Sequence, residues 1–295
     1  MSVGAWARAA LAESANLQDW RVGRWRFGWA LLATAATIVL FVMLSIGASI
    51  ALRDLATMLD LGELFTAATG ERSGILVGNP FSLANFLLIG LVGLALTWAA
   101  AAIQGRPLRE WLTLGGTFSS GRFWRMAGAF ALLQMAMLPL ILAFTAEDVR
   151  MRPGAFADPL FLLACVALIA VQTYGEELFF RGFLYHAWGA VWPRPIPVAI
   201  GVSAFFALVH AWNPDIAIDP LPGLLSIFLF GLFAQWLVAR TGSLDAAWGL
   251  HFAINLVALL GAQATPGYVG DASIIAYTDS VLASGGSYAA NPLFY

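Results

Sequence analysis

Long apolar runs recur along this chain and constrain its fold more than any other feature. A helix needs about 20 mostly apolar residues to cross the hydrocarbon core of a bilayer. In lipid a helix satisfies its own backbone hydrogen bonds, which an open sheet cannot do. The pattern therefore predicts an all-α fold, a polytopic integral membrane helix bundle of about seven transmembrane helices. The expected spans cover residues 29–52, 81–103, 126–144, 159–184, 196–212, 220–240 and 244–260.

Composition supports a membrane location and excludes several functions. Hydrophobic residues make up 60% of the 295 residues and charged residues 11%, against about 25% charged residues in ordinary soluble domains. All 15 basic residues are arginine, so no lysine can form a Schiff base or bind phosphate in a P-loop. Cys165 is the sole cysteine, which excludes an intrachain disulfide. No basic cluster with interleaved aromatic residues indicates nucleic-acid binding.

The apolar runs divide the chain into three parts. Residues 1–27 carry arginine among tryptophan, alanine and leucine, which is typical of a cytoplasmic, interfacial segment. Residues 28–261 form the predicted bundle, and residues 262–295 form a C-terminal tail rich in Gly, Ala, Ser and Tyr. With the N-terminus inside, most arginines fall on the inner side, as the positive-inside rule asks. We predict a multi-pass protein of a bacterial inner (cell) membrane.

Charged residues near the end of the run that begins at residue 159 need an explanation, because charge at membrane depth is costly and marks functional sites. They are Glu176, Glu177 and Arg181. Glu177 and Arg181 are four residues apart, so they share one helix face and suit a structural ion pair. Glu176 is rotated by about 100° from Glu177 and is left for chemistry.

Two further apolar runs carry polar residues at comparable depth. His210 lies four residues after Phe206, and both His210 and Glu176 are roughly 20 Å from the turn that joins their helices. His251 and Asn255 are also four apart, so they can point at the same spot. A carboxylate with an imidazole can deprotonate water, and a second imidazole with an amide can donate hydrogen bonds to an oxyanion. This set suits hydrolysis of a peptide bond within a membrane.

These motifs resemble those of the CPBP family of intramembrane proteases, also called the ABI or CAAX prenyl protease family. The resemblance covers about residues 159–260. It implies that Glu176 and His210 activate water and that His251 and Asn255 form the oxyanion site. It also implies about eight helices and a membrane-embedded or membrane-anchored protein or peptide as substrate. The motifs are Glu176-Glu177-x-x-x-Arg181, Phe206-x-x-x-His210 and His251-x-x-x-Asn255.

Other functions stay open. Glu176, His210 and His251 could ligate a catalytic zinc ion, but the sequence lacks His-Glu-x-x-His, so we favour no cofactor. A non-catalytic scaffold or immunity-type protein could bind a peptide or a sensor partner in the bilayer. A proton-coupled transporter would also place polar groups at mid-depth, although no inverted repeat supports it. The sequence fixes neither the substrate nor the oligomeric state.

Each candidate residue also has a purely structural interpretation. Glu176 could pair with Arg181 to fix its helix, and His210 could be a hydrogen-bonded core histidine. Asn255 could hydrogen-bond a neighbouring helix, a common use of polar residues in membranes. His186, the third histidine, is expected near the inner interface and in contact with solvent.

Overall fold

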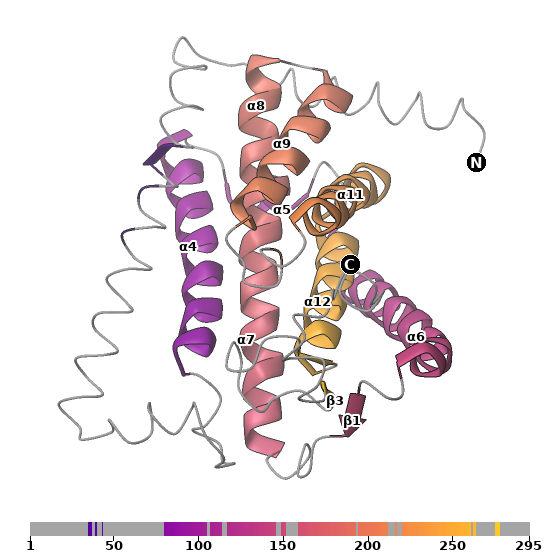
Figure 1. Ribbon diagram of the computed structural model, residues 1–295. Coiled ribbons are helices and arrows are strands. Elements are labelled where there is room, and N and C mark those ends of the chain that lie inside the picture. The colour runs from indigo at the N-terminus through magenta and orange to yellow at the C-terminus, as the bar shows by residue number, and fades with distance from the viewer. Residues whose placement is uncertain are drawn as a thin grey trace, which may run out of the picture.

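Helices packed around one long central helix dominate the computed structural model (Figure 1). The predicted segment 1–27, nearly all of the first span and most of the tail lie outside the residues that the structure describes. The described residues are 80–104, 107–113, 117–145, 149–151, 159–192, 194–211, 216, 220–260, 262–263 and 275–277, with four isolated positions between 35 and 43.

The remaining six predicted spans each coincide with a helix, and the all-α expectation is confirmed for the described residues. The elements are α4 (Pro80–Gln104), α5 (Arg109–Leu112), α6 (Ser120–Thr145), α7 (Pro159–Glu177), η2 (Leu178–Leu184), α8 (Tyr185–Val191), α9 (Pro195–Val209), α11 (Pro220–Thr241) and α12 (Asp245–Leu260). Four of these helices begin with proline, whose fixed φ suits the first helical position and whose missing N–H is not needed there.

Short strands supply the small remainder of the regular structure. β1 (Val149–Met151) pairs antiparallel with β3 (Ile275–Tyr277), and β2 (Ala262–Gln263) pairs parallel with β3. The strand order is β1-β3-β2. The sheet joins the connection between α6 and α7 to two described pieces of the predicted tail.

The central helix is longer than predicted and changes from an α-helix to a π-helix in its middle stretch. α7, η2 and α8 follow one another without a break in helical conformation, so the helix runs from Pro159 to Val191 rather than ending at residue 184. It ends where Trp192 adopts φ −129° and ψ 84°, because the residue before a proline is pushed out of the helical region. The middle stretch, η2, is a π-helix, a form that often marks functional sites.

Glycines bring α4 against α7, which lie side by side in Figure 1. A Cβ placed on Gly175 would come within 2.6 Å of the Gly90 Cα, and one placed on Gly90 would come within 2.7 Å of the Val171 carbonyl carbon. Small residues of this kind allow two membrane helices to approach at backbone distance. Since Gly175 directly precedes Glu176, this contact fixes the backbone that carries the candidate carboxylate.

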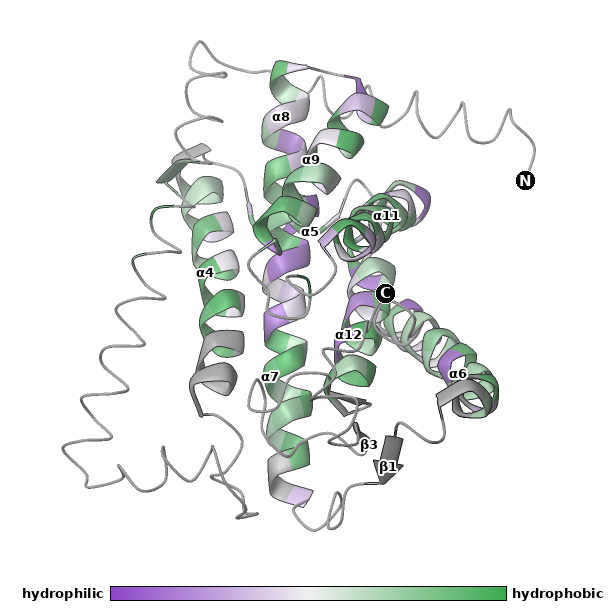
Figure 2. Ribbon diagram, viewed as in Figure 1, coloured by the Kyte–Doolittle hydropathy of each residue, from purple (hydrophilic) through white to green (hydrophobic). Residues whose placement is uncertain are grey.

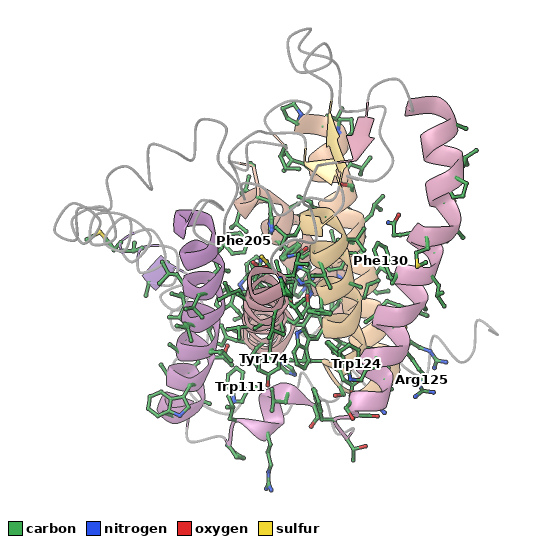
Figure 3. All side chains as sticks on the ribbon, turned by 90° about the horizontal axis from the view of Figure 1, so that it is seen from below. Trp111, Trp124, Arg125, Phe130, Tyr174 and Phe205 are labelled. Carbon is green, nitrogen blue, oxygen red and sulfur yellow. The ribbon has the colours of Figure 1, made fainter. Side chains whose placement is uncertain are left out.

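An ion pair and a backbone hydrogen bond to Asp245 fix the start of α12. Arg122 of α6 donates from Nε to Asp245 Oδ1 at 2.8 Å and from Nη2 to Oδ2 at 2.7 Å, and the Ser119 backbone N–H donates to Oδ2 at 2.6 Å. The hydrogen bond to Asp245 raises the pKa of the Arg122 guanidinium, so the arginine keeps its charge. Arg125, one turn further along α6, points away from the bundle instead (Figure 3).

A tight turn joins α11 to α12, between the spans expected at 220–240 and 244–260. Gly242 has φ 66° and its N–H donates to the Val238 carbonyl at 2.8 Å, which is how glycine commonly closes a helix C-terminus. One turn further along α12, Trp248 Nε1 donates to the Ala170 carbonyl of α7 at 3.1 Å. The helix that carries His251 and Asn255 is therefore held at its start and against α7.

Most residues of α4, α6 and α11 are apolar (Figure 2), and many of their large apolar side chains are exposed. Contiguous exposure of this kind marks surfaces that bind protein or lipid. By length and composition, two segments among the described residues can cross a membrane, Leu162–Val191 and Pro220–Thr241. Large side chains that are 63–78% exposed on these faces and on α7 include Trp98, Trp124, Leu132, Met135, Leu163 and Leu221.

Candidate active site

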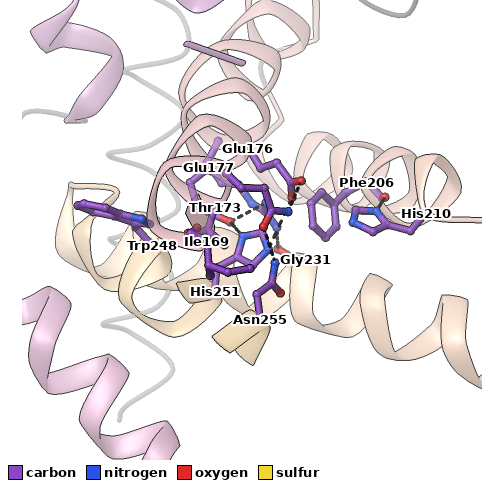
Figure 4. A network of polar contacts seen from close by, with 12 residues as sticks. Ile169, Thr173, Glu176, Glu177, Phe206, His210, Gly231, Trp248, His251 and Asn255 are labelled. Carbon is purple, nitrogen blue, oxygen red and sulfur yellow. Dashed lines mark hydrogen bonds and ion pairs between the residues drawn. The ribbon is translucent and has the colours of Figure 1, made fainter. Parts of the chain in front are cut away.

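The predicted ion pair between Glu177 and Arg181 is present, and Glu177 lies within the network of polar contacts drawn in Figure 4. Arg181 Nη1 donates to Glu177 Oε1 at 3.0 Å, and both side chains are fully buried. The guanidinium carbon lies 4.5 Å from the centre of the Phe206 ring, and Nη2 donates to the Gly231 carbonyl at 3.4 Å. The pair therefore joins α7 to η2, and Arg181 extends the contact to α9 and α11.

His251 of α12 lies between the two glutamates. Its Nδ1 is 2.8 Å from Glu177 Oε1, and its Nε2 is 3.6 Å from Glu176 Oε2. A carboxylate accepts hydrogen bonds, so the bond to Glu177 places a proton on Nδ1. In the neutral ring Nε2 is then the basic nitrogen, and it faces Glu176.

One carboxylate oxygen of Glu176 accepts a hydrogen bond from a described residue and the other does not. Gln172 Nε2 donates to Glu176 Oε1 at 2.8 Å, whereas Oε2 has no hydrogen-bond partner among the described residues. Glu177 Oε2 lacks such a partner as well. The two glutamates differ in exposure, because 7% of the surface of Glu176 is exposed to solvent and none of the surface of Glu177 is. Glu176 is therefore the less completely buried of the two carboxylates.

His210 lies just past the end of α9, where its ring caps its own helix. Its Nδ1 is 2.7 Å from the Phe206 carbonyl oxygen, one of the carbonyls that a helix end leaves without a partner. The two rings are 4.5 Å apart between centres. In the view of Figure 4 the Phe206 ring lies between Glu176 and His210. The described contacts of Glu176 go to Gln172 and His251, so a direct pairing with His210 stays a prediction.

Asn255 joins the site through a residue that the sequence analysis missed. Its Nδ2 donates to Gln172 Oε1 at 3.1 Å, and Gln172 in turn donates to Glu176. The signal was present in the sequence, because Gln172 is a buried amide within an apolar run, four residues before Glu176. The predicted site residues thus form one network that runs from Asn255 to the Phe206 ring and His210.

A family comparison covers the segment that carries these residues. Residues 158–257 match the model of the Rce1-like family, described as type II CAAX prenyl endopeptidase Rce1-like. The matched segment holds all of the motif residues, so the resemblance inferred from the motifs is confirmed. The curated protein YyaK of Bacillus subtilis (strain 168), described as uncharacterized, is 28% identical over 161 residues, which are 54% of each chain. The chain thus aligns with about half the length of this relative. No solved structure matches.

The zinc alternative finds little support in the arrangement of the Rce1-like segment. Glu176 and His251 face one another, and the bond to the Phe206 carbonyl takes up Nδ1 of His210 and leaves only its Nε2 as a possible ligand. Within the described part of the chain, no three or more His, Cys, Asp or Glu side chains gather so that they could hold a metal ion. We therefore derive no catalytic step through a metal.

The prediction for His186 was wrong, because this third histidine of the Rce1-like segment is fully buried. The central helix continues through it to Val191, and the His186 Nδ1 contacts the Gly182 carbonyl one turn earlier. The Trp111 ring of α5 covers it, with ring centres 6.4 Å apart. The segment before α6 therefore packs against this end of the central helix.

Proposed function

We propose that this chain is an intramembrane endopeptidase of the CAAX protease type, which cleaves peptides embedded in or anchored to a membrane. The Rce1-like match supports the reaction class. The exposed apolar faces and the two helical segments of membrane-spanning length support a multi-pass location. A bundle of about seven to eight membrane helices in a bacterial inner (cell) membrane is part of the proposal.

In the proposed mechanism Glu176 Oε2 accepts a proton from water while the water oxygen attacks the peptide carbonyl carbon. His210, whose Nδ1 is occupied by the Phe206 carbonyl, assists this step through Nε2. The second N–H of Asn255 donates to the oxyanion that develops on the carbonyl. His251 Nε2 can take up the proton and then also donate to the oxyanion. The proton finally passes to the leaving amine as the C–N bond breaks.

One observation carries this proposal more than any other. Glu176 Oε2 has no hydrogen-bond partner among the described residues although it is buried, whereas the groups around it are fixed. Gln172 holds the other oxygen, and Glu177 sets the proton on His251. Buried polar atoms generally have a partner, so the unpartnered Oε2 is where Glu176 would bind the reacting water; Glu177 Oε2 also lacks a partner among the described residues, but Glu177 keeps no exposed surface.

Glu176→Gln is expected to reduce cleavage by about 10²–10⁴-fold, the usual contribution of a general base. The change keeps the size of the side chain and removes its ability to accept the proton of water. Quantitative proteomics of membranes from cells with wild-type or Glu176→Gln protein should show full-length precursors that accumulate only with the variant.

Arg240→Gln is the matched control, because it removes a charge from the exposed end of α11. It should leave the precursors processed. If Glu176→Gln leaves every peptide end in the membrane proteome unchanged, the protease proposal fails. If the variant keeps the cellular effect of the wild type without cleavage, the scaffold or immunity-type function is favoured.

Treatment with a strong chelator is expected to leave cleavage unchanged, because the proposed steps use only side chains. The measurement is the rate of precursor processing in washed membranes, together with elemental analysis of the purified protein. Loss of activity that zinc alone restores would contradict this expectation and make Glu176, His210 and His251 the candidate ligands.

A further inference from the structure

We infer that Gln172 is a positioning residue that orients both Glu176 and Asn255 for the reaction; the inference rests on the proposed function. Gln172 is 5% exposed and lies on α7, one turn before Glu176. Its amide spans the gap to α12 with two hydrogen bonds, of 2.8 Å to Glu176 and 3.1 Å from Asn255. It thereby connects the first and the third sequence motifs.

The partners decide which way the Gln172 amide faces. An ionised carboxylate only accepts hydrogen bonds, so the nitrogen of Gln172 must face Glu176. Its oxygen then faces Asn255 and can only accept, so Asn255 must present its nitrogen. The direction of both amides is therefore set by the charge of Glu176. Because Gln172 is buried, little water competes for these bonds.

This arrangement has a consequence for each of the two groups it connects. Gln172 occupies Oε1 of Glu176, so Oε2 is the oxygen offered to water. It also takes one N–H of Asn255, which aims the second N–H of the same amide. Both groups must hold their positions closely, since a displacement of about 1 Å can cost about 100-fold in rate.

A bond that merely ties α7 to α12 would give the same distances, so the test needs a structural control. Thr173, the next residue, is also buried, but its hydroxyl donates to the Ile169 carbonyl of its own helix at 2.7 Å. Thr173→Val therefore removes a buried hydrogen bond of α7 without touching the site. Gln172→Met removes both amide contacts and keeps a side chain of similar length.

The experiment compares these variants by infrared spectroscopy of the full-length protein in lipid nanodiscs. The carboxyl band that disappears in Glu176→Gln belongs to Glu176. It is expected to shift in Gln172→Met, which removes the donor to Oε1, and also in Asn255→Ala, which frees Gln172 from the other helix. It should stay in place in Thr173→Val. In cells, Gln172→Met should slow precursor processing by about 100-fold, and Thr173→Val should not.

The possible outcomes separate the two proposals. An unshifted Glu176 band in Gln172→Met and in Asn255→Ala overturns the role of Gln172, even if Glu176→Gln abolishes cleavage. If Gln172→Met does not fold, the position of the Glu176 band in Asn255→Ala decides whether Gln172 orients Glu176. A shifted band with normal processing in Gln172→Met also overturns the role in the reaction. If Glu176→Gln itself still processes the precursors, it is the protease proposal that fails.

Discussion

Arg181→Met is expected to lower the free energy of unfolding by about 3–5 kcal/mol, because it leaves the charge of Glu177 buried without its cation. Neither side chain has more than 1% of its surface exposed. The variant also loses the contact between the guanidinium and the Phe206 ring, and buried contacts of this kind are stabilising. The loss should appear in unfolding by SDS in mixed micelles, followed by tryptophan fluorescence.

Two matched variants test whether the unpaired charge is the cause. The double variant Glu177→Gln with Arg181→Met removes both charges and should recover much of the stability, since an apolar or neutral pair can replace a buried ion pair. Arg240→Met, at the exposed end of α11, should unfold like the wild type. If Arg181→Met were as stable as Arg240→Met, the ion pair would contribute nothing to holding the bundle together.

Gly175→Val is expected to cost at least about 3 kcal/mol, the upper part of the usual range for overpacking. Its Cβ would fall on the backbone of Gly90, which cannot move aside as a flexible side chain can. α4 must then separate from α7, and the backbone that carries Glu176 shifts with it. We therefore expect both a lower midpoint in the same SDS titration and a loss of precursor processing.

Gly128→Val provides the comparison for this change. Gly128 lies within α6, and a Cβ built on it would meet no atom within 4 Å. Glycine is replaced by valine in a helix in both variants, so the change in helix propensity is similar, but at Gly128 the new side chain meets no neighbouring helix. Equal losses in the two variants would show that helix propensity, rather than the approach of α4 to α7, accounts for the effect.

The sequence predicted the helices well because hydropathy and proline positions determine them locally. The spans expected at 81–103 and 220–240 differ from α4 and α11 by a residue or so at each end. The pair Glu177 and Arg181 was also predictable, since a spacing of four on one helix fixes its geometry without knowledge of the fold. Each of these inferences depends only on residues close together in the chain.

The contacts between helices were less predictable, because counting residues gives the depth of a side chain but not the direction in which its helix faces. Depth placed Glu176 level with both His210 and His251, and only the packing of α12 against α7 shows that His251 faces it. Gln172 was overlooked because a lone amide in an apolar run draws less attention than a charge. Its partner Asn255 lies on another helix.

The π-helix η2 has a consequence for how this chain is aligned with similar sequences. A π turn closes from residue i to i+5 and takes in one residue more than an α turn, and each residue of an α-helix adds about 100° of rotation. Tyr185 and His186 are therefore out of phase with Glu176, and a helical wheel drawn through residues 159–191 assigns them to the wrong side. A relative without the π turn should align with a single-residue gap between residues 178 and 184.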